Sequence, residues 1–446
     1  MFCNQNKNIS RMNNIIGIRH EDKYVMERRI PLTPKHVKYL IKNQNLEVLV
    51  ESSPKRIFKD EEFEKAGAII TNDLKRAPVI FGVKEIPESY FEKGKTYIFF
   101  SHVIKGQEYN MPMLKKMMEK KCNLIDYEKI MDEQGRRLIF FGKYAGLAGM
   151  INSLWSLGLR LKHFGFETPF IKIKQSHLYD SLEEAKNDIS KVGFEIAEKG
   201  LPKELTPLTI GFTGYGNVSI GAQEITNLLP VKEISPSELL DLKNRSDLPD
   251  NVIYKIIFKE EDLSEPLDNN MEFDLQDYYD HPKKYKDQFE KYINHITVLM
   301  NCMYWDERYP RIITKDFLEK IYKEGNPKLT VIGDITCDPD GSIECTHKGT
   351  EIEDPVFVYN PFTGKPNMGH EGEGIMIMSV DILPSELPRE SSIYFGDTFV
   401  KYVKAIAIAD YNVSLELLNL PNPVKKALIL YQGKLTPDYE YIAEYL

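Results

Sequence analysis

Residues 208–222 read LTIGFTGYGNVSIGA, an apolar run that meets two glycines spaced as G-x-G. The run predicts a strand and residues 221–229 predict a helix, so Gly214 and Gly216 stand at a strand-to-helix turn. In such a turn the second glycine lets pyrophosphate approach the backbone, and the helix N-terminus offers unpaired N–H groups. The third glycine of the fingerprint would fall at Ser219, which is small enough to replace it. The pattern favours a dinucleotide-binding turn over a glycine turn without a ligand.

The residues that follow the turn bear on the choice of cofactor. An acid that holds the ribose is expected about 20 positions after the glycines, where Glu233 stands. The strand there ends at Ser235 with Lys232 nearby, and a neutral residue beside a cation tolerates a 2′-phosphate, which favours NADPH over NADH. The expected cofactor contacts in this region are Gly214, Gly216, Asn217, Val218, Ser219, Glu233 and Ser235.

Composition limits the class of protein. The 446 residues have room for two or three domains, and 42% hydrophobic residues supply a sizeable core. A net charge of −9 with both signs interspersed argues against nucleic-acid binding and fits a protein that handles small molecules. The five cysteines form no C-x-x-C pair and no His cluster accompanies them, which predicts free thiols in a reducing compartment and no metal site.

Two further segments bear on location. The polar N-terminus, MFCNQNKNISRMNN, contains no apolar stretch of the kind found in signal peptides. The apolar segment 138–161 includes a lysine, an asparagine and two serines, and we expect a buried helix there rather than a membrane span. We therefore expect a cytoplasmic location, with a mitochondrial one left open.

Strand and helix patterns alternate over the first 150 residues and again from Leu208 onward, which predicts parallel sheets. Residues 144–163 predict a long helix leaving the first domain, and residues 394–412 predict a helix near the C-terminus. Residues 259–292 are rich in Asp, Glu, Lys and Tyr, and we expect a solvated excursion with one helix.

Two strands of the first domain end in side chains that can move protons. Lys84 follows the apolar run of VIFGVKEIP (79–87), and His102 follows that of YIFFSHVIKGQ (97–107). Ligands of open α/β sheets bind beyond the carboxyl ends of strands, so the two form a candidate acid–base pair. The alternative is that both are ordinary surface residues at strand ends.

Seven motifs occur in an order that resembles one enzyme family. They are ERRIPLTPKHV (27–37), GVKEIP (82–87), FFSHVIKGQE (99–108), LIDYEKIMDEQGRRLIFFGKYAGLAGMI (124–151), FTGYGNVSIGAQ (212–223), DITCDPDGSIE (334–344) and EGEGIMIMSVDILPSELP (371–388). Together they resemble the lysine–ketoglutarate reductase domain of aminoadipic semialdehyde synthase and the lysine-forming saccharopine dehydrogenases of fungi, within an alanine dehydrogenase-like superfamily. The resemblance spans about residues 14–440.

The resemblance implies an α/β fold of two Rossmann-like domains with parallel sheets and an interdomain cleft. The substrate (catalytic) domain would be discontinuous, formed by residues 1–145 and 375–446. Residues 146–374 would form the dinucleotide-binding domain.

The resemblance also implies a reaction in which the ε-amine of L-lysine condenses with 2-oxoglutarate and the imine is reduced to saccharopine. NADPH would be the reductant, with NADH/NAD as the alternative. By their positions in the motifs, Lys84 and His102 would be the acid–base pair and Glu128 would tune it. The implied substrate-binding residues are Arg29, Lys105, Gln107, Arg137 and Phe141, and the further implied cofactor contacts are Arg136, Asn301 and Asp334.

The chain departs from the bifunctional family members in two places. It ends at Leu446 without room for their second dehydrogenase domain, so we expect a separate saccharopine dehydrogenase to consume the product. Ile220 stands where they carry a lysine beside the phosphate turn, which weakens the NADPH expectation. The expected partners are therefore lysine, 2-oxoglutarate and saccharopine, with no nucleic acid or membrane. A homo-oligomer is compatible with the resemblance.

Three alternatives stay open at this point. The chain can run the same equilibrium toward lysine with NAD, or keep the fold for another substrate, as alanine dehydrogenase does. It can also be a catalytically inactive regulatory homologue, whose sign would be the loss of Lys84 or His102, and both are present.

Overall fold

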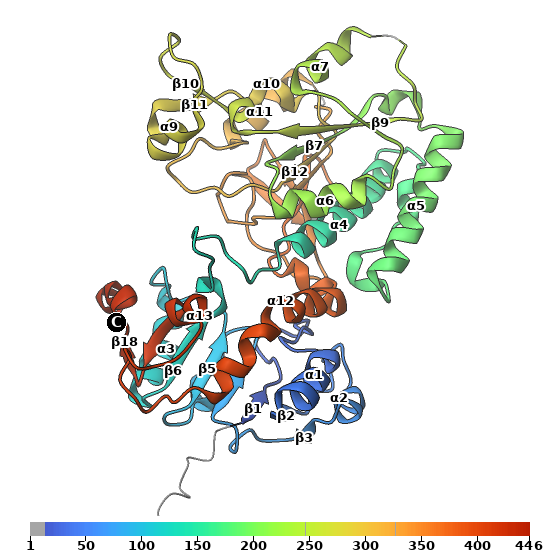
Figure 1. Ribbon diagram of the computed structural model, residues 1–446. Coiled ribbons are helices and arrows are strands. Elements are labelled where there is room, and N and C mark those ends of the chain that lie inside the picture. The colour runs from blue at the N-terminus through green and yellow to red at the C-terminus, as the bar shows by residue number, and fades with distance from the viewer. Residues whose placement is uncertain (1–13, 246, 326) are drawn as a thin grey trace, which may run out of the picture. The chain divides into compact units, whose positions relative to one another are not determined.

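The computed structural model describes residues 14–245, 247–325 and 327–446 (Figure 1). The chain divides into two compact units, the first formed by the chain up to Phe141 together with Pro388–Leu446 and the second by Gly142–Leu387. The chain leaves the first unit and returns to it, four residues before and thirteen after the boundaries placed from sequence at 145 and 375. Cys3 and the rest of the polar N-terminal stretch before Asn14 lie outside the described residues.

Unit 1 contains an eight-stranded sheet in the order β18-β17-β6-β5-β4-β1-β2-β3. Its strands are β1 (Ile15–Ile18), β2 (Glu47–Glu51), β3 (Ile69–Thr71), β4 (Val79–Phe81), β5 (Thr96–Phe99), β6 (Asn123–Asp126), β17 (Leu428–Tyr431) and β18 (Lys434–Leu435). The first six are mutually parallel. β17 pairs antiparallel with β6, and β18 pairs antiparallel with β17. Parallel strands leave all their carboxyl ends at one edge of the sheet.

Helices from both parts of the chain complete unit 1. They are α1 (Pro34–Gln44), α2 (Asp60–Ala66), α3 (Met111–Glu119), α12 (Pro388–Ile408) and α13 (Asn422–Lys426). Figure 1 shows the red C-terminal segments beside the blue N-terminal strands. Phe395 and Phe399 of α12 make edge-on contacts with the buried Tyr127 ring, with centroids 4.9 and 5.0 Å apart. The helix predicted at 394–412 is therefore part of the core of the first unit.

Unit 2 contains a second eight-stranded sheet, in the order β15-β14-β16-β13-β12-β7-β9-β8. Its strands are β7 (Leu208–Thr213), β8 (Val231–Glu233), β9 (Ile253–Phe258), β12 (Val298–Asn301), β13 (Val331–Asp334), β14 (Val356–Asn360), β15 (Lys365–Met368) and β16 (Ile375–Met378). Six of them are mutually parallel, whereas β14 pairs antiparallel with both of its neighbours, β16 and β15. Two mostly parallel sheets with helices confirm the α/β class.

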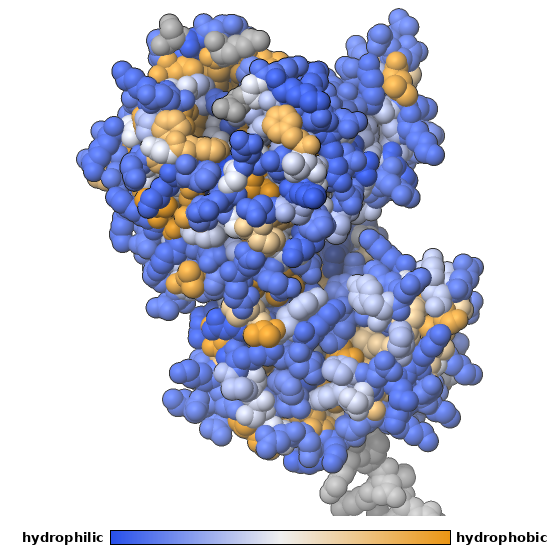
Figure 2. Space-filling view, turned by 180° about the vertical axis from the view of Figure 1, so that it is seen from behind, coloured by the Kyte–Doolittle hydropathy of each residue, from blue (hydrophilic) through white to orange (hydrophobic). Residues whose placement is uncertain are grey.

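The helices of unit 2 include the long one predicted from sequence. They are α4 (Gly142–His163), α5 (Leu182–Lys199), α6 (Asn217–Thr226), α7 (Pro236–Asp241), α8 (Glu260–Leu263), α9 (Leu275–Asp280), α10 (Glu290–Ile293) and α11 (Lys315–Glu324). Among the described residues, no helix combines the length and the apolar character of a membrane-crossing segment. The surface seen in Figure 2 is mostly hydrophilic, with apolar side chains in small scattered groups.

Glycines allow α4 and α6 to pack closely. A Cβ atom on Gly146 would lie 1.9 Å from the Val218 carbonyl oxygen, and one on Gly221 would lie 2.0 Å from the Lys143 carbonyl oxygen. Both distances are too short for any side chain, so the helix backbones touch at these two residues. Ser219, at the place of the third glycine of the fingerprint, is fully buried in the same helix, and the close contact is made two residues later by Gly221.

Residues 259–292 are more ordered than a solvated excursion. They contain α8, α9 and α10, together with a separate antiparallel hairpin of β10 (Ser264–Pro266) and β11 (Tyr285–Asp287). Tyr278 and Tyr285 are buried, with ring centroids 5.2 Å apart. The prediction of a single helix in a solvated segment was wrong, because the tyrosines that made the segment look polar form a small aromatic core of their own.

Candidate functional site

The carboxyl edge of the unit 1 sheet collects charged side chains from four neighbouring strands. Arg19 follows β1, Lys84 follows β4, His102 follows β5 and Glu128 follows β6. Each strand is only three or four residues long and fully or mostly buried, so the first polar residues come just beyond its end. The short parallel strands thus bring the predicted acid–base residues to one edge.

His102 is bound to a carboxylate that the sequence analysis did not single out. Its Nδ1 lies 2.7 Å from Glu85 Oε1, and the same oxygen lies 2.5 Å from Lys23 Nζ. Burial alone would raise the pKa of Glu85, but the hydrogen bond with His102 and the ion pair with Lys23 hold that pKa at about 2. Glu85 is therefore ionised at neutral pH and orients the imidazole.

The backbone holds His102 in an uncommon conformation. Its φ is +48°, in the left-handed region where residues other than glycine are rare. The Asn110 side chain donates to the His102 carbonyl at 3.2 Å, and the buried Asp126 carboxylate accepts from the Ser101 N–H at 3.0 Å. These two bonds fix the loop on both sides of the ring. Backbone strain of this kind clusters at functional sites because the surrounding structure must sustain it.

Lys84 is held through its backbone. The buried Glu21 carboxylate accepts from the N–H groups of Val83 and Lys84, at 2.7 and 2.9 Å. Burial raises the pKa of Glu21. The Lys84 ammonium lies 5.6 Å from the centre of the Tyr24 ring, and the side chain is partly exposed. Lys84 and His102 thus stand on adjacent strands, each fixed by a buried glutamate.

Arg29, predicted to bind substrate, is buried and engaged by the protein itself. Its guanidinium donates to both oxygens of Glu27, at 2.8 and 2.6 Å, and is 4% exposed. Burial would raise the pKa of Glu27, but Arg29 lowers it. The guanidinium also lies 4.3 Å from the centre of the Phe141 ring, which stacks on Phe395 at 5.0 Å. Arg29 therefore supports the predicted aromatic contact, Phe141.

The other predicted substrate residues are more accessible. Arg137 is 40% exposed on its side chain, 3.6 Å from Glu128 and 5.8 Å from the centre of the Phe100 ring. Lys105 is exposed and Gln107 partly exposed, and the Lys105 N–H donates to the Gln107 side chain at 3.3 Å. These cationic and amide groups are available to a carboxylate ligand.

Arg136, a predicted cofactor contact, lies on the turn before Arg137. Its side chain is 76% exposed and donates to Asp132 at 2.7 Å. The Asp132–Gly135 turn and this exposed pair orient Arg136 away from the core.

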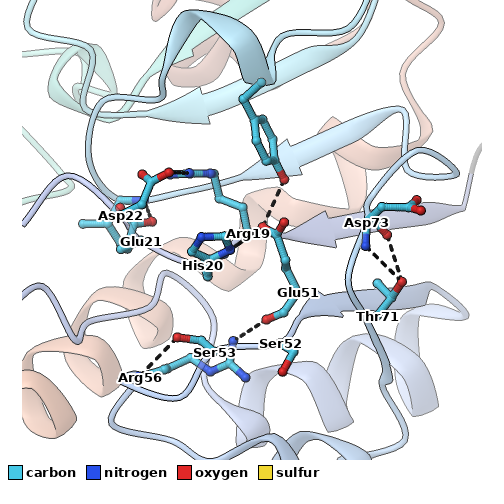
Figure 3. Close-up of polar contacts among 12 residues, drawn as sticks. Arg19, His20, Glu21, Asp22, Glu51, Ser52, Ser53, Arg56, Thr71 and Asp73 are labelled. Carbon is cyan, nitrogen blue, oxygen red and sulfur yellow. Dashed lines mark hydrogen bonds and ion pairs between the residues drawn. The ribbon is translucent and has the colours of Figure 1, made fainter. Parts of the chain in front are cut away.

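Arg19 is a charged residue at this edge that the sequence analysis missed. It is 1% exposed, faces Asp22 at 2.9 Å and lies 4.8 Å from the centre of the Tyr90 ring. Close by, Glu51 accepts from the Tyr90 hydroxyl at 3.1 Å and pairs with His20 at 3.0 Å (Figure 3). The signal was present in the sequence, because Arg19 and His20 directly follow the first apolar run.

In unit 2, the glycine turn follows β7 as predicted. Gly214 has φ +81°, and a Cβ there would lie 3.0 Å from Met303 Cβ. A Cβ on Gly216 would meet nothing within 4 Å, so the backbone at the start of the ten-residue helix α6 is open. Asn217 is exposed and Val218 partly exposed at that helix start. An open backbone with free N–H groups at a helix N-terminus fits a diphosphate.

Asn301 and Asp334, expected beside the nicotinamide, form a buried network. The Asn301 amide donates to Asp334 at 2.8 Å and to Ser342 at 2.8 Å, and accepts from the Thr213 hydroxyl at 3.0 Å. Burial raises the pKa of Asp334, which accepts from Thr346 at 2.6 Å. Both residues are at most 1% exposed, so they fix the ends of β7, β12 and β13 rather than offering free surface.

The structure does not bring Glu233 and Ser235 to the glycine turn. β8 is the outermost strand, and β9 lies between it and β7. Glu233 pairs with Lys255 of β9 at 2.8 Å, and the Ser235 hydroxyl accepts from the Glu238 N–H at the start of α7. The expected position of the ribose acid assumed that the second strand along the chain lies next to the first, and an inserted strand separates them.

Comparison with known proteins shows which proteins this chain resembles. The descriptions "Alanine dehydrogenase/PNT, N-terminal domain" and "Alanine dehydrogenase/PNT, C-terminal domain" match residues 17–148 and 257–438. Alpha-aminoadipic semialdehyde synthase of Arabidopsis thaliana is 39% identical over 96% of this chain, and that of Mus musculus is 37% identical over 96%. This chain spans only 41% and 47% of the length of these two relatives.

A more distant relative is matched over most of its length. Saccharopine dehydrogenase [NAD(+), L-lysine-forming] of Emericella nidulans is 27% identical, over 87% of this chain and 90% of its own. Among solved structures, an L-alanine dehydrogenase superposes with a TM-score of 0.63 over 97% of this chain and all of its own, at 16% identity. A transhydrogenase of Sinorhizobium meliloti superposes with a TM-score of 0.56, over 95% of this chain and all of its own. With both domains matched in order along a two-unit α/β fold, the chain belongs to the alanine dehydrogenase/PNT family.

Proposed function

We propose that the chain is an oxidoreductase that condenses L-lysine with 2-oxoglutarate and reduces the product to saccharopine with a pyridine nucleotide. This would be the first step of lysine degradation. The observation that carries the proposal is the His102–Glu85–Lys23 group beside Lys84 at one sheet edge, with 2.7 and 2.5 Å contacts. The similarity to alpha-aminoadipic semialdehyde synthase over 96% of the chain supports the choice of substrates.

The chemistry requires one group that gives a proton and one that takes protons. The carbonyl oxygen of 2-oxoglutarate leaves as water, so its hydroxyl intermediate needs an acid, and the lysine amine must lose protons to a base. With its Nδ1–H donating to Glu85, the neutral His102 ring keeps Nε2 as an acceptor, and the charged ring donates from Nε2. We assign His102 and Lys84 to these two roles, and Glu85 to the orientation of the imidazole.

Three carboxylates of the two substrates need cationic or amide partners. Arg137, Lys105 and Gln107 are accessible at the same end of unit 1, and we assign them to this task. Glu128, 3.6 Å from Arg137, is proposed to tune the acid–base pair. Substrate binding by Arg29, as predicted, requires that its guanidinium exchange Glu27 for a ligand carboxylate. Its contact with the Phe141 ring already holds that ring in place.

Unit 2 is proposed as the dinucleotide-binding domain and unit 1 as the catalytic domain. The open backbone at Gly216, the left-handed Gly214 and the start of α6 would hold the diphosphate. Bound there, the cofactor supplies the hydride. Arg136, Asn217, Val218 and Ser219 remain predicted contacts, and Asn301 and Asp334 support the strand ends from within. The NADPH preference also remains a prediction, whose basis at Ser235 lies one strand farther from the turn than expected.

The same residues serve the reaction in the lysine-forming direction, which the name of the Emericella nidulans relative describes. The compounds bound would then be identical, with saccharopine as the substrate and lysine and 2-oxoglutarate as the products. The cytoplasmic location stays a prediction, and the names of the mouse and cattle relatives specify mitochondria.

A coupled assay tests the proposal. Purified protein with lysine, 2-oxoglutarate and either NADH or NADPH should lose nicotinamide absorbance, and mass spectrometry should find saccharopine. The control replaces lysine and 2-oxoglutarate with ammonium and pyruvate, which should give no turnover. Oxidation of the cofactor with ammonium and pyruvate but not with lysine and 2-oxoglutarate would reject the proposed reaction.

A further inference from the structure

Glu260 comes two residues after the end of β9, the strand that borders β7 on the side away from β12. Thr213 pairs with Phe258, and the Gly214 N–H donates to the Phe258 carbonyl at 2.9 Å, so β7 and β9 end together. In sheets of this kind, the acid that holds the adenosine ribose follows the strand next to the glycine turn. In this chain the strand next to β7 is β9, so the acid at its end is Glu260. Glu233 would take this position only if β8, the next strand along the chain, lay beside β7.

The Glu260 carboxylate is buried but only half satisfied. The residue is 8% exposed, and Oε1 accepts from the Tyr279 hydroxyl at 2.6 Å. Oε2 is buried and makes no hydrogen bond within 3.5 Å to the described residues. The negative charge of Glu260 and its polar contact with the Tyr215 hydroxyl raise the pKa of Tyr215, the middle residue of the glycine turn, so the carboxylate lies close to that turn. A buried carboxylate oxygen without a donor points to a donor that arrives with a ligand.

A cavity of about 110 Å³ adjoins the carboxylate, with Glu260, Tyr278, Tyr279, Met303 and Trp305 among its lining. Met303 comes two residues after β12, the other strand that borders β7, and is the residue nearest to Gly214. The cavity is therefore bounded by the segments that follow both neighbours of the glycine strand. Its aromatic and apolar side chains suit a flat ring, and Asp287 and Arg311 add charged groups to the lining.

The charges around Glu260 oppose a 2′-phosphate. α8 begins with Glu260, Glu261 and Asp262, and its N-cap residue, Lys259, is exposed and lies 3.8 Å from Glu261. Arg311 also lines the cavity, but its guanidinium donates to the backbone carbonyls of Gly341 and Asp340. The three adjacent carboxylates of α8 place negative charge around Glu260. A phosphate placed there would be repelled, whereas ribose hydroxyl groups would donate to the free Glu260 oxygen.

We infer that Glu260 selects the cofactor by accepting hydrogen bonds from the adenosine ribose hydroxyls, so that the chain uses NADH in preference to NADPH. The inference rests on the proposed use of a pyridine nucleotide at the Gly214 turn. The ribose would therefore be bound at the end of β9 rather than β8. The ordered segment 259–292 would enclose the adenosine part of the cofactor.

Direct binding tests the inference without the reaction. Dissociation constants of NADH and NADPH are measured by fluorescence titration of the full chain, with no lysine or 2-oxoglutarate present. We expect the wild type to bind NADH at least about tenfold more tightly than NADPH, and Glu260→Gln to reduce that ratio to about threefold or less. The matched control Glu233→Gln, on the outermost strand β8, should keep the wild-type ratio. Thermal melting of each variant checks that it is folded.

Two results would overturn the inference. One is a wild type that binds NADPH as tightly as NADH, and this measurement needs no variant. The other is a preference that Glu233→Gln abolishes while Glu260→Gln leaves it intact. Failure of both nucleotides to bind would reject the dinucleotide site and the inference together. Tight, Glu260-dependent NADH binding without saccharopine formation would support the inference and reject the proposed reaction.

Discussion

The two sheets of this chain have the same size but present different chemistry at their carboxyl edges. In unit 1 the edge carries Arg19, Glu21, Lys84, Glu85 and His102, all ionisable and several held by buried partners. In unit 2 the edge offers a bare backbone at Gly216 and a buried amide–carboxylate pair, Asn301 and Asp334. One edge is suited to moving protons and the other to holding a phosphate-linked cofactor.

The sheets also differ in strand order. In unit 1 the second strand along the chain, β2, lies next to the first, as in the common doubly wound arrangement. In unit 2 the inserted β9 displaces β8 from β7. A rule that counts residues from a glycine turn to an acid holds only when no strand intervenes, so here spatial neighbours decide which acid matters.

The largest expected effect is on the proton-moving edge. His102→Asn should lower kcat by roughly 10²–10⁴-fold, because asparagine accepts the left-handed backbone at φ +48° but cannot exchange a proton. Lys84→Ala should lower kcat by a similar factor. Steady-state kinetics with lysine and 2-oxoglutarate give the loss, and cofactor binding by unit 2 should be unchanged. Variants that turn over like the wild type would remove the acid–base role from this edge.

The next effect concerns the stability of unit 2. Gly221→Ala should lower the free energy of unfolding by about 1–3 kcal/mol, since its Cβ would lie 2.0 Å from the Lys143 carbonyl oxygen. Thermal or urea denaturation measures the change. The matched variant Gly216→Ala, with no atom within 4 Å of its Cβ, should keep the stability and weaken dinucleotide binding. Equal stability losses in both variants would contradict the close packing of α4 on α6.

A pH effect should distinguish the glutamate that holds His102. The pKa of Glu85 falls from its ordinary 4.5 to about 2 because His102 and Lys23 outweigh burial. The depressed pKa stabilises the fold above pH 4.5, and this contribution is lost as the pH falls toward 2. Glu85→Gln should therefore lose roughly 1–3 kcal/mol at pH 7 and show a flatter decline of unfolding free energy between pH 5 and 2. Parallel pH profiles for variant and wild type would exclude the ion pair as the cause.

The smallest expected effect is at Arg136. Its side chain is 76% exposed and pairs only with nearby groups of its own turn, so Arg136→Ala should change the unfolding free energy by less than about 0.5 kcal/mol. If Arg136 contacts the cofactor as predicted, nucleotide affinity should fall a few-fold. A calorimetric titration measures this, and an unchanged affinity would remove Arg136 from the cofactor contacts.

The sequence predicted the elements that depend on local patterns. The glycine turn after Thr213, the long helix now seen as α4 and the strand ends at Lys84 and His102 all follow from apolar runs and their breaks. These features need only neighbouring residues, so a linear pattern can reveal them.

The features that the sequence did not predict depend on contacts between residues that are distant along the chain. The partner of His102 is Glu85, seventeen residues earlier, and the residue order does not show that the two side chains meet. The strand β9 is an apolar run in the sequence, but its insertion between β7 and β8 depends on which strands pair. The aromatic contacts of Tyr278 likewise turned a segment of polar composition into an ordered one. Pairing and burial of this kind are set by the whole fold.

The discontinuity of unit 1 has a consequence for how the protein is made. β17 pairs with β6 across some three hundred residues of chain, and α12 supplies Phe395 and Phe399 to the N-terminal half. During synthesis the ribosome therefore delivers all of Gly142–Leu387 before the first sheet can acquire its last strands. Unit 2 can fold while the chain is still being translated, whereas the N-terminal part of unit 1 must wait, with its hydrophobic surface incomplete, until residues 388–446 emerge. Loss of residues 388–446, through a premature stop or proteolysis, would therefore disrupt unit 1, the proposed catalytic domain, although most of that unit is encoded at the start of the chain.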